Sequence, residues 1–218
     1  MKNIPRIFIG DNITPGKIMP ISRDTAHYLT RVMRTDKCLV FGGGDEFNAR
    51  VNERGDGLII GEKTDHNDPS GDITLMFAPI KRTDDIINMA TQMGVAAFLP
   101  VITDRTTAHH INWGRMKKIA TEASEQSNRN SVPVILPAVK FSELALSDIV
   151  FADERAAYGN VTSDAAAGAK SILIGPEGGF SDSEFAALDA AGARGISLGR
   201  TILRAEVAAI IAISKITQ

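Results

Sequence analysis

The sequence lacks most of the features that mark secreted, membrane-embedded or disulfide-bonded proteins. Cys38 is the only cysteine among 218 residues, so no disulfide can form within the chain. No run of about 18 apolar residues occurs, and the first residues lack the basic and apolar regions of a signal peptide. These absences argue against a membrane-spanning helix and lead us to expect a cytoplasmic protein.

Motifs of several common binding sites are also missing. None of the four histidines has a partner at metal-ligand spacing, and no cysteine pair exists, so we expect no metal site. The Gly-Lys-Ser/Thr element of a phosphate-binding loop and the Gly-x-Gly-x-x-Gly fingerprint of dinucleotide binding do not occur. The two most common nucleotide-binding motifs are therefore excluded.

Positive charge is concentrated although the chain is nearly neutral. The formal net charge is −2, but residues 1–34 contain six basic and two acidic side chains. A local positive patch on a neutral protein can bind a phosphate backbone. Charge alone leaves a solvated surface without a partner as an equally good interpretation.

The first part of the chain is typical of a small β domain. Short apolar segments at 6–9, 38–41, 47–51 and 58–60 are separated by glycine- and aspartate-rich turns, a spacing that predicts a small barrel or sandwich. Residues 23–33 form the helical candidate of this part, and the polar, turn-rich residues 65–72 are typical of a linker. We therefore expect a β domain over residues 1–70.

Residues 73–218 alternate between strand and helix patterns. Strands are expected at 73–78, 95–102, 149–152, 171–174 and 195–198. Thr83 can cap one helix, Asn112 opens a second, Ser181 and Glu184 form a capping box for a third, and residues 206–216 form the last. This alternation is typical of an α/β layer fold with a mainly parallel sheet.

Two glycine-bearing turns directly follow predicted strands of this region. They are Gly175-Pro176-Glu177-Gly178-Gly179-Phe180 and Leu198-Gly199-Arg200-Thr201-Ile202-Leu203-Arg204. Parallel sheets bind ligands beyond the carboxyl ends of their strands, and glycine lets main-chain groups approach a ligand such as an adenine ring. Glu177 would repel a pyrophosphate and suits a cationic or amine-bearing ligand such as a sulfonium cofactor. One such turn could merely connect a strand to a helix; two in one domain favour a binding site.

Together the two turns resemble the paired signatures of the SPOUT superfamily of RNA methyltransferases, and within it the bacterial enzymes that methylate N3 of a uracil in 16S rRNA. The resemblance extends to Lys81, Arg105, the segment 122–133, and the N-terminal segments 6–8 and 27–34. The family usually has threonine where Ala205 and Val207 stand.

The resemblance implies a fold, a cofactor and a partner. The fold would be a PUA-like RNA-binding β-barrel over residues 1–70 and a SPOUT methyltransferase domain over residues 73–218 with a C-terminal trefoil knot. The cofactor would be S-adenosyl-L-methionine, the substrate 16S rRNA of the small ribosomal subunit, and the assembly a homodimer. The expected cofactor-binding residues are Leu173, Ile174, Gly175, Pro176, Glu177, Gly178, Gly179, Leu198, Gly199, Ile202, Leu203 and Arg204.

Methyl transfer to uracil N3 needs negative charge on the base to be stabilised, which a fixed guanidinium can do. We assign this role to Arg204, with Arg129 as a second candidate and Glu206 as proton acceptor or as the group that orients Arg204. A purely structural ion pair between Arg204 and Glu206 or Glu177 is the alternative. The expected RNA contacts are Arg6, Arg31, Arg34, Lys81 and Arg105.

Three other functions remain open at this level. The chain could be an RNA-binding module that has lost activity, and Ala205 and Val207 would be the reason. It could be a nucleotide-binding enzyme that uses the glycine turns for a phosphate. It could also be a SPOUT methyltransferase that modifies another RNA.

Overall fold

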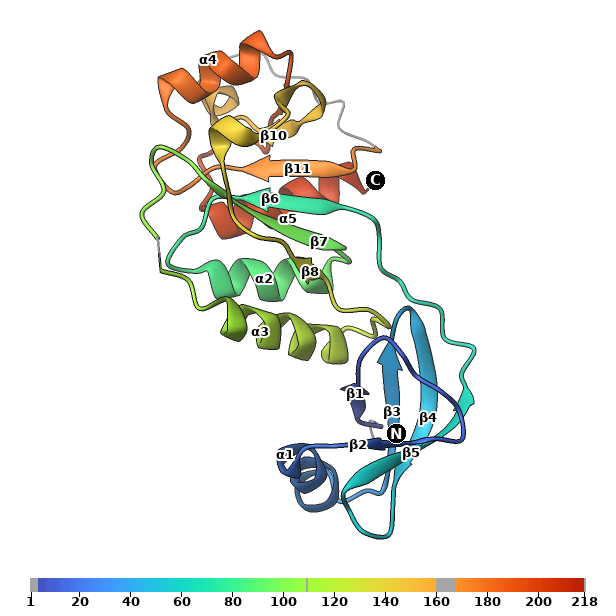
Figure 1. The fold of residues 1–218 in the computed structure, drawn as a ribbon. Coiled ribbons are helices and arrows are strands. Elements are labelled where there is room, and N and C mark those ends of the chain that lie inside the picture. Colours follow the sequence, from blue (N-terminus) through green and yellow to red (C-terminus); the bar gives the residue numbers. More distant parts are fainter. Residues whose placement is uncertain (1–3, 109, 160–167, 218) are drawn as a thin grey trace. The chain divides into compact units, whose positions relative to one another are not determined.

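The computed structural model describes residues 4–108, 110–159 and 168–217. The chain divides into two compact units, one made of Met1–Ser70 with Ser124–Val132 and the other of Gly71–Ala123 with Pro133–Gln218 (Figure 1). No helix in the described part of the chain is both long and apolar enough to cross a bilayer.

The first unit is built on a five-stranded sheet. Its strands are β1 (Arg6–Phe8), β2 (Ile18–Pro20), β3 (Lys37–Gly42), β4 (Asp45–Val51) and β5 (Gly57–Lys63), in the order β1-β3-β4-β5-β2. The β1 and β3 strands pair in parallel, and the other pairs are antiparallel. Four of these strands are those predicted from the sequence. The prediction missed β2, a short strand that ends in a proline.

Alternate residues of these strands face one core. Val40, Phe47, Leu58 and Ile60 are buried there together with Leu29. Leu29 comes from the segment predicted as one helix over 23–33. The structure confirms a helical segment there and adds that α1 (Arg23–His27) passes into a turn of π-helix over Tyr28–Val32. The wider turn still buries Leu29, the one fully buried residue of the segment.

The segment Ser124–Val132 belongs to the first unit, which the sequence-based division at 70 and 73 did not anticipate. The Arg6 guanidinium is the main tie. It donates to Glu46 Oε2 at 2.8 Å, to the Arg129 carbonyl at 2.9 Å and to Asn130 Oδ1 at 2.8 Å. Asn130 in turn donates to the His66 carbonyl at 3.0 Å. Buried polar groups hold this segment against the strands.

The second unit contains a parallel sheet. Its strands are β6 (Thr74–Phe77), β7 (Ala97–Ile102), β8 (Val134–Ile135), β9 (Val139–Lys140), β10 (Val150–Ala152), β11 (Ser171–Ile174) and β12 (Arg194–Ile196). The order is β12-β10-β11-β6-β7-β8, with β9 beside β7. Every pair is parallel, so all carboxyl ends lie at one edge of the sheet. The predicted α/β fold with a parallel sheet is confirmed.

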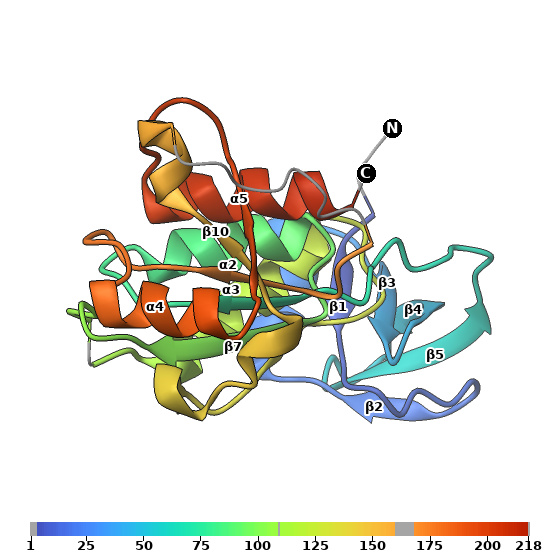
Figure 2. The same cartoon turned by 90° about the horizontal axis from the view of Figure 1, so that it is seen from above.

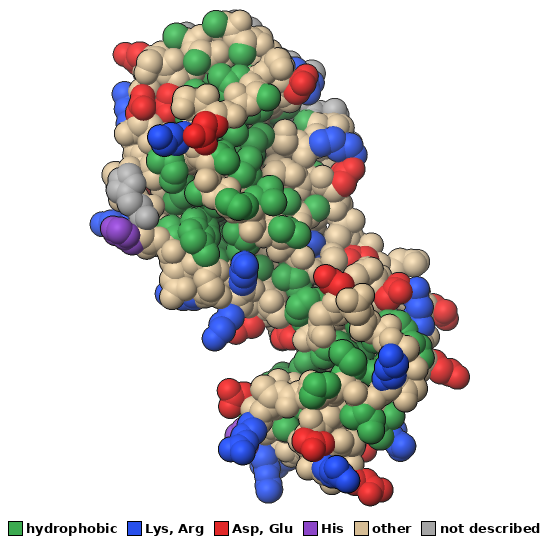
Figure 3. Space-filling view, viewed as in Figure 1, with side chains coloured by type: hydrophobic (Ala, Val, Ile, Leu, Met, Phe, Trp, Pro, Cys, Tyr) green, Lys and Arg blue, Asp and Glu red, His purple; other side chains and the backbone are tan. Residues whose placement is uncertain are grey.

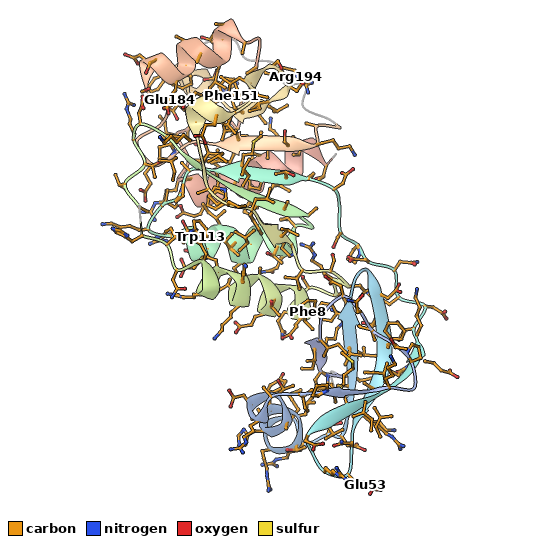
Figure 4. All side chains as sticks on the ribbon, viewed as in Figure 1. Phe8, Glu53, Trp113, Phe151, Glu184 and Arg194 are labelled. Carbon is orange, nitrogen blue, oxygen red and sulfur yellow. The ribbon has the colours of Figure 1, made fainter. Side chains whose placement is uncertain are left out.

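Helices cover both faces of this sheet (Figure 2). They are α2 (Thr83–Gln92), α3 (Trp113–Gln126), α4 (Asp182–Ala190) and α5 (Ala205–Ile216). Leu173 faces a core with Phe151, Phe180 and Leu188 of α4, and Phe151 is marked in Figure 4. Ile172 and Ile174 alternate to the other face, where α5 contacts β11 and packs on α2. Both faces of β11 are therefore buried.

Two of the three predicted helix caps are present in the structure, and one is not. Ser181 and Glu184 form the predicted capping box, and Asn112 Oδ1 accepts from the Arg115 N–H at 3.0 Å at the start of α3. Thr83 is not a cap: it is the first residue of α2, and its hydroxyl donates to the Ile80 carbonyl at 2.8 Å. The Thr83 hydroxyl therefore stabilises the tight turn before α2 rather than the start of the helix.

Candidate active site

A pocket lies at the carboxyl edge of the parallel sheet in the second unit. Three neighbouring strands, β10, β11 and β12, send their following segments into it. The lining residues are Ala152, Asp153, Glu154, Ala157, Ile174, Gly175, Pro176, Glu177, Leu198, Gly199, Thr201, Ile202, Leu203, Ala205 and Ala208. The two glycine-bearing turns, separated by an entire helix and strand, therefore meet at one pocket.

Most of the cofactor residues predicted from the sequence line this pocket. They are Ile174, Gly175, Pro176, Glu177, Leu198, Gly199, Ile202 and Leu203. Four others do not. Leu173 is fully buried in the core below, Gly178 and Arg204 each adjoin a lining residue in the chain, and Gly179 follows Gly178. Strand alternation explains Leu173, since its side chain points to the face opposite to that of Ile174.

The turn after β11 is held in place by Phe180. This ring is 1% exposed and lies 6.2 Å, centroid to centroid, from Phe151 in an edge-on arrangement, and 5.6 Å from Phe185. A Cβ on Gly175 would come within 3.2 Å of the Phe180 ring. The aromatic cluster thus fixes the end of the turn, and glycine at 175 lets the main chain pass close over it.

Asp153 and Glu154 contribute carboxylates that the sequence analysis missed. Both follow β10, so the rule that ligands bind beyond strand ends could have found them. Asp153 is buried and accepts from Arg155 Nε at 2.9 Å and from Arg155 Nη2 at 2.7 Å. Arg155 also donates to both carboxylate oxygens of Asp189 at 2.8 and 2.9 Å. This pairing raises the pKa of the Arg155 guanidinium and fixes the segment after β10.

Unlike Asp153, Glu154 has no arginine among the described residues that binds its carboxylate. It is half-buried, and no hydrogen bond or ion pair reaches its carboxylate from the residues that the structure describes. Burial raises the pKa of Glu154, and the charge of Asp153 raises it further, while Arg105 and Arg155 act in the opposite direction. With Asp153 and Glu177, it gives the pocket three carboxylates among mainly apolar walls.

Arg204 and Glu206 do not form the ion pair considered from the sequence. Arg204 precedes α5 and is exposed, and within the described residues its guanidinium makes no ion pair. Glu206 is 6% exposed, and its Oε1 lies 3.6 Å from Nη1 of Arg82. Arg82, not Arg204, therefore carries the opposing charge. The role of Glu206 as proton acceptor stays a prediction.

Arg129 belongs to the first unit, where its side chain is buried. Burial lowers the pKa of its guanidinium, and the charge of Asp68 opposes this shift. Arg129 does not line the pocket. Arg129 is only 1% exposed, so a contact with an RNA base would need a rearrangement. Its assignment as a second catalytic arginine stays a prediction.

The predicted RNA contacts fall into two groups. Arg31, Arg34, Lys81 and Arg105 are exposed. Figure 3 shows Lys and Arg side chains gathered over α1. Arg31 and Arg34 follow α1 closely in the chain. Arg105 also donates from Nη1 to the Gly178 carbonyl at 2.8 Å and so touches the turn after β11. The prediction for Arg6 is corrected, because its side chain is only 7% exposed and donates to groups in the interior of the unit.

Comparison with known proteins gives the family. A family model described as RNA methyltransferase domain matches residues 66–217. The ribosomal RNA small subunit methyltransferase E of Rickettsia conorii is 32% identical, over 97% of this chain and 94% of that protein. The chain belongs to the ribosomal RNA small subunit methyltransferase E family. The family-level resemblance seen in the two glycine turns is confirmed.

Other members of the ribosomal RNA small subunit methyltransferase E family extend the comparison. The Synechocystis protein of the same name is 29% identical, over 87% of this chain and 69% of that protein. A crystal structure of the family member from Neisseria gonorrhoeae, bound to S-adenosyl methionine, is 27% identical with a TM-score of 0.80, over 97% of this chain and 96% of that chain. Both units are therefore shared with a family member of known structure.

Proposed function

We propose that this chain transfers the methyl group of S-adenosylmethionine to 16S rRNA of the small ribosomal subunit, at N3 of a uracil. The observation that carries the proposal is the convergence of both glycine turns on one pocket at the carboxyl edge of the parallel sheet. Family membership and the Neisseria gonorrhoeae protein bound to S-adenosyl methionine support the cofactor and the rRNA substrate. The choice of uracil N3 rests on the resemblance of the turns alone.

The pocket residues fit the chemistry of this cofactor. Ile174, Leu198 and Leu203 offer apolar walls for an adenine ring, and the main chain at Gly175 and Gly199 offers N–H and C=O groups to its polar edge. Glu154 and Glu177 suit a ligand that carries positive charge and hydrogen-bond donors. Bound S-adenosylmethionine would supply an electrophilic methyl group.

The chain's own task is then to position the base and stabilise its charge. Loss of the N3 proton spreads negative charge over the flanking oxygens of a uracil. Arg204 sits between Leu203 and Ala205, which both line the pocket, and its guanidinium is not used elsewhere among the described residues. A guanidinium at the rim of the pocket can stabilise that charge without a covalent step.

Three further properties are part of the proposal. We infer that the five-stranded sheet of the first unit closes into a PUA-like RNA-binding barrel, and that the turns after β11 and β12 form a trefoil knot. We also infer a homodimer, since Ile202 and Val207 are exposed apolar side chains next to the pocket, at 59% and 41%. A ribosomal substrate would place the enzyme in the cytoplasm. Light scattering on the purified protein tests the dimer.

The activity is tested by incubating the protein with labelled S-adenosylmethionine and unmodified small subunits, followed by digestion of the RNA and mass spectrometry. We expect label in 3-methyluridine from 16S rRNA. Label in a different nucleoside would change the target, and label in tRNA would change the substrate. Tight binding of subunits without any incorporation would indicate a non-catalytic RNA-binding module.

A further inference from the structure

Glu154 occupies a central place in the pocket of the second unit. It directly follows Asp153, the residue after β10, and β10 lies between β11 and β12 in the sheet. The turns after β11 and β12 line the same pocket as Glu154. A side chain between the two turns can contact whatever ligand both of them hold.

The Glu154 carboxylate is half-buried yet lacks a donor within the described part of the chain. The nearby cations are engaged elsewhere. Arg155 holds Asp153 and Asp189 through five hydrogen bonds from its side chain and one more from its main chain to Asp153. Arg105 donates to the Gly178 carbonyl. A partly desolvated carboxylate without donors is unfavourable, and a ligand that supplies donors would remove this cost.

Gly179 makes room for this arrangement. Its main chain is left-handed, with φ +69°, and a Cβ built there would overlap Glu154 Oε1. The Glu154 side chain therefore lies directly against the turn after β11. A glycine at 179 is needed both for the backbone conformation and for the position of the carboxylate.

We propose that the Glu154 carboxylate accepts hydrogen bonds from N–H or O–H donors of the bound cofactor and so sets its affinity. The inference rests on the proposed function, since it takes S-adenosylmethionine as the ligand. That molecule has three sources of such donors: the adenine 6-amino group, the ribose hydroxyls and the α-ammonium group. The sulfonium has neither N–H nor O–H and does not meet this need.

Calorimetry with three ligands tests the proposal. S-Adenosylhomocysteine lacks the sulfonium charge, and methylthioadenosine lacks the amino acid as well but keeps the adenine and the ribose. Glu154→Gln removes the charge at nearly constant size. We expect about a tenfold loss of affinity for both S-adenosylmethionine and S-adenosylhomocysteine, because charge-assisted hydrogen bonds are about twice as strong as neutral ones. Glu53→Gln, which changes an exposed carboxylate of the first unit that does not line this pocket, is the matched control.

The third ligand identifies the donor. An equal loss for methylthioadenosine assigns Glu154 to the adenosine part, through its ribose hydroxyls or its adenine amino group, and unchanged affinity for it assigns Glu154 to the ammonium group. The proposal is overturned if the three affinities change by less than about twofold, if the loss is confined to S-adenosylmethionine, or if Glu53→Gln gives the same loss. Failure of wild-type protein to bind S-adenosylmethionine would instead refute the proposed function.

Discussion

Arg6 and Glu46 form a salt bridge in the interior of the first unit, with Nε and Oε2 2.8 Å apart and the two side chains only 7% and 5% exposed. The Arg6 guanidinium also stacks over Phe41, 4.6 Å from the ring centroid. A buried pair of this kind is costly to break, because the remaining partner keeps an uncompensated charge. Arg6 therefore serves the fold of the unit, although its sequence context had suggested an RNA contact.

The first prediction follows from this salt bridge. Arg6→Ala should lower the free energy of unfolding by about 3–5 kcal/mol, because Glu46 would stay buried without its partner. Chemical denaturation measures this, with Arg31→Ala as an exposed control that should change stability by less than about 0.5 kcal/mol. Unchanged stability of Arg6→Ala together with weaker RNA binding would restore Arg6 as a phosphate contact.

Two glycines with nearly the same φ angle allow a matched test of the pocket. Gly179 has φ +69° and Gly192 has φ +71°, but a Cβ at Gly192 would meet nothing within 4 Å. Each change to alanine should cost about 1–2 kcal/mol of stability for the left-handed backbone. Only Gly179→Ala should also weaken S-adenosylmethionine binding, because it displaces Glu154. Equal affinities of the two variants, measured by calorimetry, would contradict this.

Cofactor affinity should depend on pH through Glu154. Burial raises the pKa of Glu154 in the free protein, Asp153 raises it further, and Arg105 and Arg155 partly offset both. Donors from a bound ligand favour the carboxylate and lower this pKa, so binding releases a proton. Affinity should therefore rise with pH through the raised pKa and level off above it.

The matching measurement is the dissociation constant of S-adenosylmethionine from about pH 5 to pH 8, where the cofactor's own α-amino group begins to titrate only at the upper end. Wild-type affinity should increase over the lower part of this range, and Glu154→Gln should show a flat profile there. A slope that survives in Glu154→Gln would assign the titration to another group.

Local signals in the sequence predicted most of the elements of both units. The capping box of Ser181 and Glu184 needs only side chains three residues apart, and the buried strand 171–174 needs only a short apolar run before a glycine. The same signals place both glycine turns after parallel strands, which is why most of the pocket lining could be predicted. Each of these inferences depends on neighbours in the chain.

Features that depend on distant partners could not be predicted in this way. The burial of Arg6 depends on Glu46 and Asn130, which lie 40 and 124 residues away in the chain. The attachment of Ser124–Val132 to the first unit has the same origin. The turn of π-helix at Tyr28–Val32 places Leu29 in the core of the first unit. Tertiary packing decides these cases.

RNA binding should depend on the exposed arginines near α1. Arg31→Gln combined with Arg34→Gln should weaken binding of 16S rRNA fragments, and should lower the slope of log affinity against log salt by about 0.7–0.9 for each phosphate that is no longer neutralised. Arg50→Gln removes an exposed charge from β4 of the same unit and is the control. If the double variant and the control bind alike across the salt series, this surface does not bind RNA.

Arg204 should separate catalysis from cofactor binding. Its guanidinium has no ion-pair partner among the described residues, so Arg204→Ala should leave stability and S-adenosylmethionine affinity within a few-fold of wild type. Turnover should fall by at least about 100-fold, the usual loss when one donor to a developing oxyanion is removed. Arg82→Ala is the control, because it removes the cation paired with Glu206 at the start of the same helix. Single-turnover kinetics with small ribosomal subunits bound to the enzyme measures turnover for both variants. A loss of cofactor affinity in Arg204→Ala with unchanged turnover at saturation would make Arg204 a binding residue. Equal losses of turnover in the two variants would instead show that the effect comes from disordering the N-terminus of α5.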